Sequence, residues 1–308
     1  MVKYIYRLIC QSFWKKQIEN ILKLVYNKIK KFKEGFTMEI KYENLTLELN
    51  EEGNYTIISC DKDVTEVNVP AEVNGIYITQ IGDNAFEDCD KLVSITFQDD
   101  FDLFESKKTI NEIGDGAFSG CSSLLRFDIP RAVTIIGRET FYNCISLTEV
   151  THDDFEEFEI GYVGTESFCN CKKLVTLPII QRIGESAFSG CAKLGTIPLE
   201  LSCYEIGEKS FAYCESLTEV KLSSLLWQIN GMAFRGCHNL KRVEFEDTKN
   251  WYVHFDEFAD LCDMKNAKDN NSPFGDYGIV EQIDVTNPES NARTLSTVDY
   301  DDGVFHIA

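Results

Sequence analysis

The sequence predicts an α/β solenoid of about eight stacked coils, each built from a short parallel strand and a short helix or turn. Three observations lead to this fold class. A Phe, a Cys three residues later and a Leu three residues after that recur in seven segments, and successive Phe residues are 32, 23, 27, 20, 23 and 23 residues apart. After each Leu, apolar and polar residues alternate as in a strand with one buried face. Units of this length bury their apolar face only against neighbouring units, so they stack into a solenoid.

The three repeated positions are filled in every segment. The Phe residues are Phe86, Phe118, Phe141, Phe168, Phe188, Phe211 and Phe234. The Cys residues are Cys89, Cys121, Cys144, Cys171, Cys191, Cys214 and Cys237. The Leu residues are Leu92, Leu124, Leu147, Leu174, Leu194, Leu217 and Leu240. Because residues three apart share one face of a helical turn, we expect each Phe and Cys to point into the stack from a short helix.

A Gly stands four residues before six of the Phe residues. These are Gly82, Gly114, Gly137, Gly164, Gly184 and Gly207. A glycine here permits either a tight turn or a backbone approach that a side chain would block. The seventh repeat has Asn230 followed by Gly231 instead, which predicts a shifted turn.

The pattern Ile-Gly-x-x-Ala-Phe-x-x-Cys-x-x-Leu, as in Ile81-Gly-Asp-Asn-Ala-Phe-Glu-Asp-Cys-Asp-Lys-Leu92, resembles the BspA-like leucine-rich repeat family of bacteria and some protists. The resemblance covers roughly residues 55–253, and Val64 to Ile81 is similar to the family's usual opening coil. It implies a right-handed leucine-rich-repeat solenoid. It also implies a surface-adhesion or host-interaction role with diverse ligands, and it carries no catalytic residues.

Composition divides the chain into three predicted parts. Residues 1–37 hold nine Lys or Arg and two Asp or Glu, a net charge of +7. Because the whole chain has a net charge of −21, residues 38–308 carry −28. Residues 38–253 form the predicted solenoid with its opening coil, and residues 254–308 an acidic C-terminal cap or tail. The strongly acidic remainder disfavours binding to nucleic acid and to anionic membranes.

The basic segment 1–37 has two interpretations. Its apolar residues recur at helical spacing from Trp14 to Phe32, which suits an amphipathic helix at a membrane surface, the one membrane contact the sequence predicts. Alternatively, translation begins at Met38 and the segment is not native. The run Leu8-Ile9-Cys10 is too short for a signal-peptide core, which favours the cytoplasm. The family resemblance favours the cell surface or secretion instead.

The twelve cysteines do not predict disulfides or a metal site. Seven of them follow the repeat, so their spacing comes from the coil, and we expect buried, reduced thiols. Cys169 and Cys171 form the one close pair, and no second pair matches it as zinc would require. Among candidate nucleophile–base pairs, Cys262 and His254 lie in the acidic terminal segment without a supporting motif. We therefore expect no enzyme, no cofactor and no metal.

Two insertions are candidate binding segments. One lies between Gln98 and Thr109 and the other between Thr151 and Glu159, and both begin just after a predicted strand. Each carries a pair of aromatic residues among carboxylates: Phe101 and Phe104 in the first, Phe155 and Phe158 in the second. Such aromatics could anchor a protein partner, and the carboxylates suit a basic one. In the alternative interpretation, each Phe pair folds back as a plug beneath its own loop.

The second candidate surface is the exposed face of the strands. Its predicted binding residues are Arg126, Asp128, Glu149, Glu219 and Lys221. The face mixes both signs of charge, which suits a ligand surface and an ordinary solvated sheet equally well. The sequence thus predicts a non-catalytic protein-interaction module, with an adhesin or host-interaction protein as one form of it. The alternative is a glycan-binding cell-surface protein.

Overall fold

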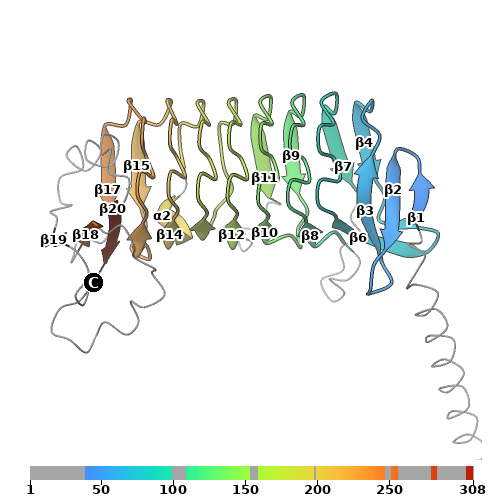
Figure 1. Ribbon diagram of the computed structural model, residues 1–308, viewed down its shortest axis with the longest axis horizontal. Coiled ribbons are helices and arrows are strands. Elements are labelled where there is room, and N and C mark those ends of the chain that lie inside the picture. The colour runs from blue at the N-terminus through green and yellow to red at the C-terminus, as the bar shows by residue number, and fades with distance from the viewer. Residues whose placement is uncertain are drawn as a thin grey trace, which may run out of the picture. The chain divides into compact units, whose positions relative to one another are not determined.

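The computed structural model describes residues 39–98, 109–152, 159–197, 199–246, 251–255, 279–282 and 303–307. The chain divides into two compact units, residues 1–40 and 41–308. The second unit contains the repeats, which form a β-solenoid of about seven turns (Figure 1). We number the coils 1 to 7 by their Phe residues, from Phe86 to Phe234. The predicted boundaries at residues 37 and 253 stay predictions.

One side of the solenoid is built from strands of four residues, which begin two residues after a repeat Leu except for the strand of the opening coil. These strands are β4 (Glu66–Val69), β7 (Ser94–Phe97), β9 (Arg126–Ile129), β11 (Glu149–His152), β15 (Glu219–Leu222) and β17 (Arg242–Phe245). They pair in parallel and in register as β4 with β7, β9 with β11, and β15 with β17. Along β9 and β15 the burial alternates from exposed to buried, as the sequence predicts.

A second row of parallel strands runs along another side of the coils. Its strands are β6 (Ile76–Ile81), β8 (Glu112–Ile113), β10 (Ile135–Ile136), β12 (Tyr162–Val163), β13 (Arg182–Ile183), β14 (Glu205–Ile206) and β16 (Gln228–Ile229). Of these, β6 and β8 lie in one sheet and the strands from β10 to β16 in another. Each ends on a buried Ile or Val, and a glycine or Asn230 follows directly. Figure 1 shows these short strands succeeding one another in chain order along the solenoid.

The predicted short helix around each Phe is wrong. The residues two before and two after every Phe adopt left-handed backbone angles, which interrupt an α-helix. In coil 1 the amides of Asn84, Phe86 and Asp88 donate to carbonyl groups of coil 2, at 2.9, 2.7 and 2.7 Å. These inter-coil bonds take the place of helical i to i−4 bonds. Among the described residues the single α-helix is α2 (Leu199–Ser202), so the fold is a β-solenoid and not α/β.

The repeat Phe and Leu residues make the core. Every repeat Phe is 2% exposed or less, and consecutive Phe rings stack with centroids 4.8 to 5.5 Å apart. A second aromatic column, Phe97 and Phe127, packs edge-on beside coils 1 to 3. The rings therefore follow the spacing of the coils, which is close to that of strands in a sheet.

The repeat cysteines are free and fully buried, as predicted. From coil 2 onward each thiol Sγ lies 3.1 to 3.4 Å from the carbonyl oxygen of the Phe in the preceding coil, to which it donates. The same carbonyl accepts the backbone amide of its own coil's Cys. A small apolar side chain with a weak donor fits this place, which explains Cys there.

The repeat glycines serve close backbone approach and not a left-handed turn. None of the six has a positive φ. A Cβ on Gly164, Gly184 or Gly207 would lie 2.9, 2.8 or 2.5 Å from the backbone carbon of the glycine one coil earlier. The predicted shift in the seventh repeat does not occur, because the Asn230 amide donates to Ile206 at 2.8 Å, as Gly207 does to Ile183.

The long-strand side is interrupted in coils 4 and 5. There the backbone makes an isolated bridge between Glu149 and Thr176, and Pro178 follows without an amide to donate. Because Pro178 and Pro198 cannot donate a backbone hydrogen bond, the sequence predicts short strands in these coils. Pro198 lies outside the described residues, and α2 begins directly after it.

Antiparallel strands occur at both ends of the second unit. At the N-terminal end β1 (Glu39–Tyr42), β2 (Leu45–Leu49) and β3 (Tyr55–Cys60) join the sheet through β6, and β5 (Glu72–Val73) pairs with β6. At the other end β20 (Gly303–Ile307) pairs with β16 and β18 (Trp251–Phe255), and β18 pairs with β19 (Ile279–Gln282). No helix in the described part of the chain has the length and apolar character needed to cross a membrane.

Candidate functional site

The structure brings three of the predicted binding residues together on β9 and β11. Arg126 faces Glu149 and Asp128 faces Thr151 in the parallel register. An Arg126 guanidinium nitrogen lies 2.8 Å from Glu149 Oε2, and the Thr151 hydroxyl donates to Asp128. These side chains project from the solvent side of the strands because Phe127 and Val150 between them point into the core.

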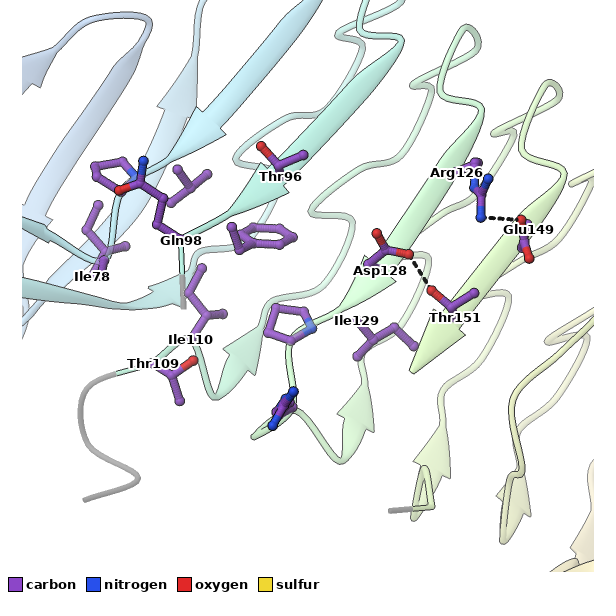
Figure 2. A pocket seen from close by; sticks show the side chains of 16 residues that line it. Ile78, Thr96, Gln98, Thr109, Ile110, Arg126, Asp128, Ile129, Glu149 and Thr151 are labelled. Atoms are coloured by element: carbon purple, nitrogen blue, oxygen red, sulfur yellow. Dashed lines mark hydrogen bonds and ion pairs between the residues drawn. The ribbon is translucent and has the colours of Figure 1, made fainter. Parts of the chain in front are cut away.

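A cavity of about 650 Å³ opens beside these residues (Figure 2). Its walls come from the ends of three neighbouring strands, β4, β7 and β9, and from the segment that returns to β8. The strand-end residues are Val69, Pro70, Ala71, Thr96, Phe97, Gln98, Ile129, Pro130 and Arg131. Thr109, Ile110 and Ile78 close it on the side of the second row of strands.

The floor of the cavity is apolar. Val69, Ile78, Ile110 and Ile129 are buried core residues, and Phe97 is half-buried at the cavity wall. The rim is polar and is formed by Arg126, Asp128, Glu149 and Thr151 in pairs that satisfy each other (Figure 2). An apolar floor inside a polar rim is the usual construction of a site for an apolar side chain or small ligand.

The residues on both sides of the first insertion line the cavity. The chain leaves the described structure after Gln98 and returns at Thr109, and both residues line the cavity. Thr151, another lining residue, directly precedes His152, after which the second insertion leaves. The insertion residues Phe101, Phe104, Phe155 and Phe158 lie outside the described residues. Sequence reasoning placed Thr96 on the exposed strand face but did not identify Phe97 and Gln98 as candidate site residues.

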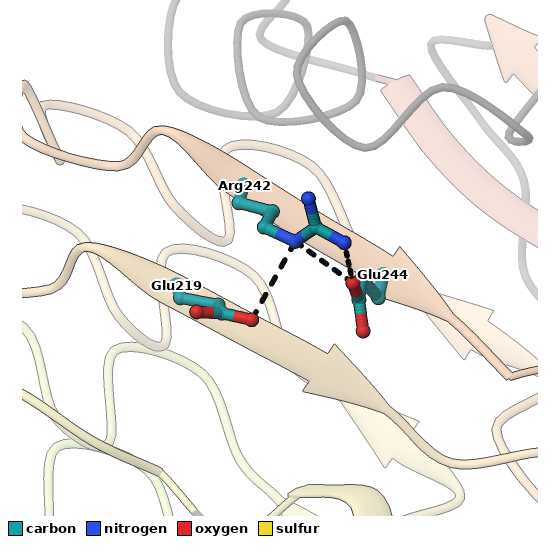
Figure 3. A network of polar contacts seen from close by, with 3 residues as sticks. All are labelled: Glu219, Arg242 and Glu244. Carbon is teal, nitrogen blue, oxygen red and sulfur yellow. Dashed lines mark hydrogen bonds and ion pairs between the residues drawn. The ribbon is translucent and has the colours of Figure 1, made fainter.

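The other two predicted residues, Glu219 and Lys221, lie on β15, three coils from Glu149. Figure 3 shows Arg242 of β17 between Glu219 and Glu244. Its Nε lies 3.6 Å from Glu219 and donates to Glu244 at 2.8 Å. The hydrogen bond from Arg242 lowers the pKa of the Glu244 carboxyl below its usual value. This cluster is exposed and self-paired, so it contributes little to stability by itself.

Chemistry beyond binding has little support among these residues. The described residues that line the cavity include no His, Cys or Ser. In the described part of the chain no group of three or more His, Cys, Asp or Glu is placed to hold a metal ion. The half-buried Cys169 has its pKa raised to about 11, mainly by burial and further by the charges of Glu166 and Glu139, so it is a poor nucleophile at neutral pH.

The stacked coils and their shared core define a repeat protein of the leucine-rich type. The BspA type leucine rich repeat region matches residues 53–152, 100–214 and 153–255, and its model spans six copies of the repeat. The chain belongs to this family. Its members are repeat proteins, typically without enzymatic activity, and the family suggests a protein-interaction module.

Solved structures of similar fold come from several bacteria. The leucine rich repeat protein of T. pallidum (TpLRR) is 24% identical, with 68% of this chain and 83% of that chain covered and a TM-score of 0.43. A leucine-rich repeat protein from Bacteroides ovatus is 18% identical, covering 66% and 88%, with a TM-score of 0.27. A leucine rich cell surface protein from Faecalibacterium prausnitzii is 16% identical, covering 70% and 97%, with a TM-score of 0.26. No curated protein matches the chain.

Proposed function

We propose that this protein is a non-catalytic interaction module that receives an apolar side chain of a protein partner in the cavity beside β7 and β9. The observation that carries the proposal is the combination of an apolar floor with a rim whose charges are already paired. A partner gains from burying an apolar anchor there without having to strip water from an unpaired charge.

The partner is expected to lie across the strand face of coils 1 to 3. Arg126, Asp128 and Glu149 then act as rim residues that exclude water around the anchor, as residues surrounding a hot spot do. Phe101, Phe104, Phe155 and Phe158 are proposed as additional contacts, since their insertions start at the cavity wall. The carboxylates beside them favour basic groups on the partner. An adhesin or host-interaction role is one form of this function.

Filling the cavity mouth tests the proposal. Random peptides displayed on phage are selected for binding to the full chain, and their affinities are measured on variants. Thr96→Trp places a bulky ring at the mouth, and Thr96 is exposed on a strand that tolerates aromatic residues. We expect about tenfold or greater loss of affinity, the typical effect of blocking a hot spot.

The matched control is Thr196→Trp, the same change at an exposed position in coil 5. Its affinity for the selected peptides should equal that of the wild-type chain, and both variants should keep the wild-type thermal midpoint. Equal peptide affinities for Thr96→Trp and Thr196→Trp would contradict the proposed site. If the selected peptides are basic and bind every variant equally well, their binding reflects only a non-specific charge effect.

Glycan binding is the second candidate, and one observation favours it. Trp227 is 42% exposed at the corner before β16, and its amide donates at 3.0 Å to Tyr204 of the preceding coil. Two neighbouring aromatic residues at an exposed corner can offer flat apolar faces to a sugar ring. A glycan array probed with the wild-type chain and with Trp227→Ala tests this candidate. If the site binds glycans, the wild-type chain gives a signal on the array and the variant does not.

A further inference from the structure

An exposed apolar ridge runs along the start of the long strands in coils 1 to 4. It is formed by residues seven positions after a Phe: the apolar Val93, Leu125 and Val175, with the half-buried Thr148 between the last two. Val93, Leu125 and Val175 are 37%, 45% and 48% exposed, and Ile145, beside Thr148, is 42% exposed. Backbone bonds join the row, from Leu125 to Val93 at 3.1 Å, from Thr148 to Leu125 at 2.9 Å and from Val175 to Thr148 at 3.0 Å.

The fold does not require apolar residues at these places. Coils 5 to 7 have Gly195, Thr218 and Lys241 at the same position. Single exposed apolar residues are ordinary on protein surfaces, but a contiguous row marks an interaction surface. With coils spaced like strands, the row spans about 14 Å from coil 1 to coil 4. It shares no residue with the cavity, although Arg126 and Glu149 of the cavity rim directly follow Leu125 and Thr148.

The two ends of the ridge carry opposite charge. The five-residue turn preceding Val93, residues 87–91, holds Glu87, Asp88 and Asp90 with one Lys, a net charge of −2. That single cation, Lys91, is paired with Asp63 at 2.5 Å. The corresponding turns before Leu125 and Thr148 carry no charge. The turn before Val175, residues 169–173, holds Lys172 and Lys173 and no carboxylate, a net charge of +2.

This order of charges is self-complementary under a two-fold rotation. An axis passing between Leu125 and Thr148 sets coil 1 of one copy against coil 4 of the other. The acidic turn of each copy then meets the Lys172–Lys173 turn of its mate, and the apolar row packs on itself. Closed two-fold interfaces need this property, in which one patch complements itself.

We propose that the ridge is a homodimer interface, with a second copy of this chain as its occupant. The footprint is small compared with interfaces of stable dimers, so association should be weak and concentration-dependent. The net charge of −21 opposes it at low ionic strength. At physiological salt, repulsion beyond about 8 Å is screened while the end contacts still act. This proposal does not depend on the proposed function of the cavity.

Sedimentation velocity of the full chain, from micromolar to millimolar concentration at physiological salt, measures the dimer. The wild-type chain should shift from monomer to dimer. Leu125→Asp should weaken the dimer by about thirtyfold, as a central anchor does. Thr218→Asp, at the same position in coil 6, should leave it unchanged. A chain that stays monomeric throughout, or a dimer that survives Leu125→Asp, overturns the proposal.

A charge exchange tests the two-fold arrangement itself. The double variant Lys172→Glu and Lys173→Glu makes both ends of the ridge acidic, and Glu87→Lys with Asp90→Lys makes both ends basic. Each double variant alone should fail to dimerise. Their mixture should form a heterodimer, visible by native mass spectrometry, because every acidic end then meets a basic end.

All of these positions are exposed, and thermal melting confirms that each variant is folded. If Leu125→Asp does not fold, the two charge-exchange variants alone test whether the ridge is the dimer interface. Failure of the mixture to associate when the wild-type chain dimerises shows that another surface makes the dimer, and the ridge proposal is then wrong.

Discussion

The first four coils and the last three bury the same residues and expose different ones. Each of the seven buries its Phe, Cys and Leu, and each donates backbone amides to its neighbours at the same places. The first four also carry the apolar ridge, the cavity and both insertions. The last three replace the ridge with Gly195, Thr218 and Lys241 and place exposed Leu225 and Trp227 at another corner.

The comparison separates requirements of the fold from features of function. A repeated position that is buried in all seven coils is set by stacking, because every coil must fit the next. A position that is apolar in three of the first four coils, and is Gly, Thr and Lys in the last three, is not set by stacking. The charged pairs on the long strands also differ between the two parts. Arg126 faces Glu149 in the first part, whereas Glu219 faces Arg242 in the second. Opposite charges suffice there, in either order.

The largest expected effect is on the aromatic core. Among the described residues, Phe118 packs against three rings, Phe86, Phe127 and Phe141, whereas Phe234 stacks on Phe211. Phe118→Ala should lower the free energy of unfolding by about 3–5 kcal/mol, and Phe234→Ala by less, near the low end of that range. Urea denaturation of both variants measures the difference. Equal losses would mean that the second aromatic column does not strengthen the first coils.

The next effect tests close approach of the coils. In Gly207→Ala the new Cβ would meet the backbone carbon of Gly184 at 2.5 Å, so neighbouring coils must move apart. We expect a loss of about 1–3 kcal/mol, as in overpacked cores. Gly195→Ala is the matched control, because its Cβ would find no atom nearer than 3.9 Å. A thermal melt in which both variants match the wild type would show that the coils adapt at little cost.

Thiol reactivity should distinguish two cysteines within one coil. Cys169 is half-exposed with its pKa raised to about 11, and Cys171 is fully buried with its pKa raised by burial. Alkylation followed by peptide mass spectrometry should modify Cys169 first among the ten described cysteines. Its rate should rise about tenfold per pH unit below the pKa, following the thiolate fraction. Early modification of Cys144, whose pKa burial raises to about 12, would show that the coils open readily.

The smallest expected effect concerns one carboxyl group in the second row of strands. Burial raises the pKa of Glu205, and the facing Arg182 offsets this only in part. The charged carboxylate is therefore less favourable in the folded chain than in the unfolded one at neutral pH. Below about pH 4, where both states are protonated, that penalty disappears.

Glu205→Gln should accordingly raise the melting temperature at pH 7 and leave it unchanged in acid. Glu185→Gln, at an exposed position of the neighbouring coil, serves as the control and should have no effect at either pH. A lower melting temperature for Glu205→Gln at pH 7 would show that the pairing with Arg182 outweighs the cost of burial.

The repeat alone determined the stacking, the buried Phe, Cys and Leu, and the parallel strands that follow Leu in five of the seven coils, because stacking imposes one period on the repeats. Arg126, Asp128 and Glu149 could be placed on one exposed face from their position in that period. The positions of Glu219 and Lys221 within their repeat likewise place them on this face, three coils away from Glu149.

The tertiary structure decided what depends on contacts between coils. Spacing of three residues between Phe and Cys suits a helix, yet amides of one coil bond the next coil, and left-handed residues replace the helical turn. A coil held by inter-coil hydrogen bonds shows the same three-residue spacing in its sequence as a helical turn, so the sequence does not distinguish the two. The cavity likewise depends on which residues of different coils lie together. Its walls come from residues as distant as Val69 and Thr151, and only the folded backbone brings them together.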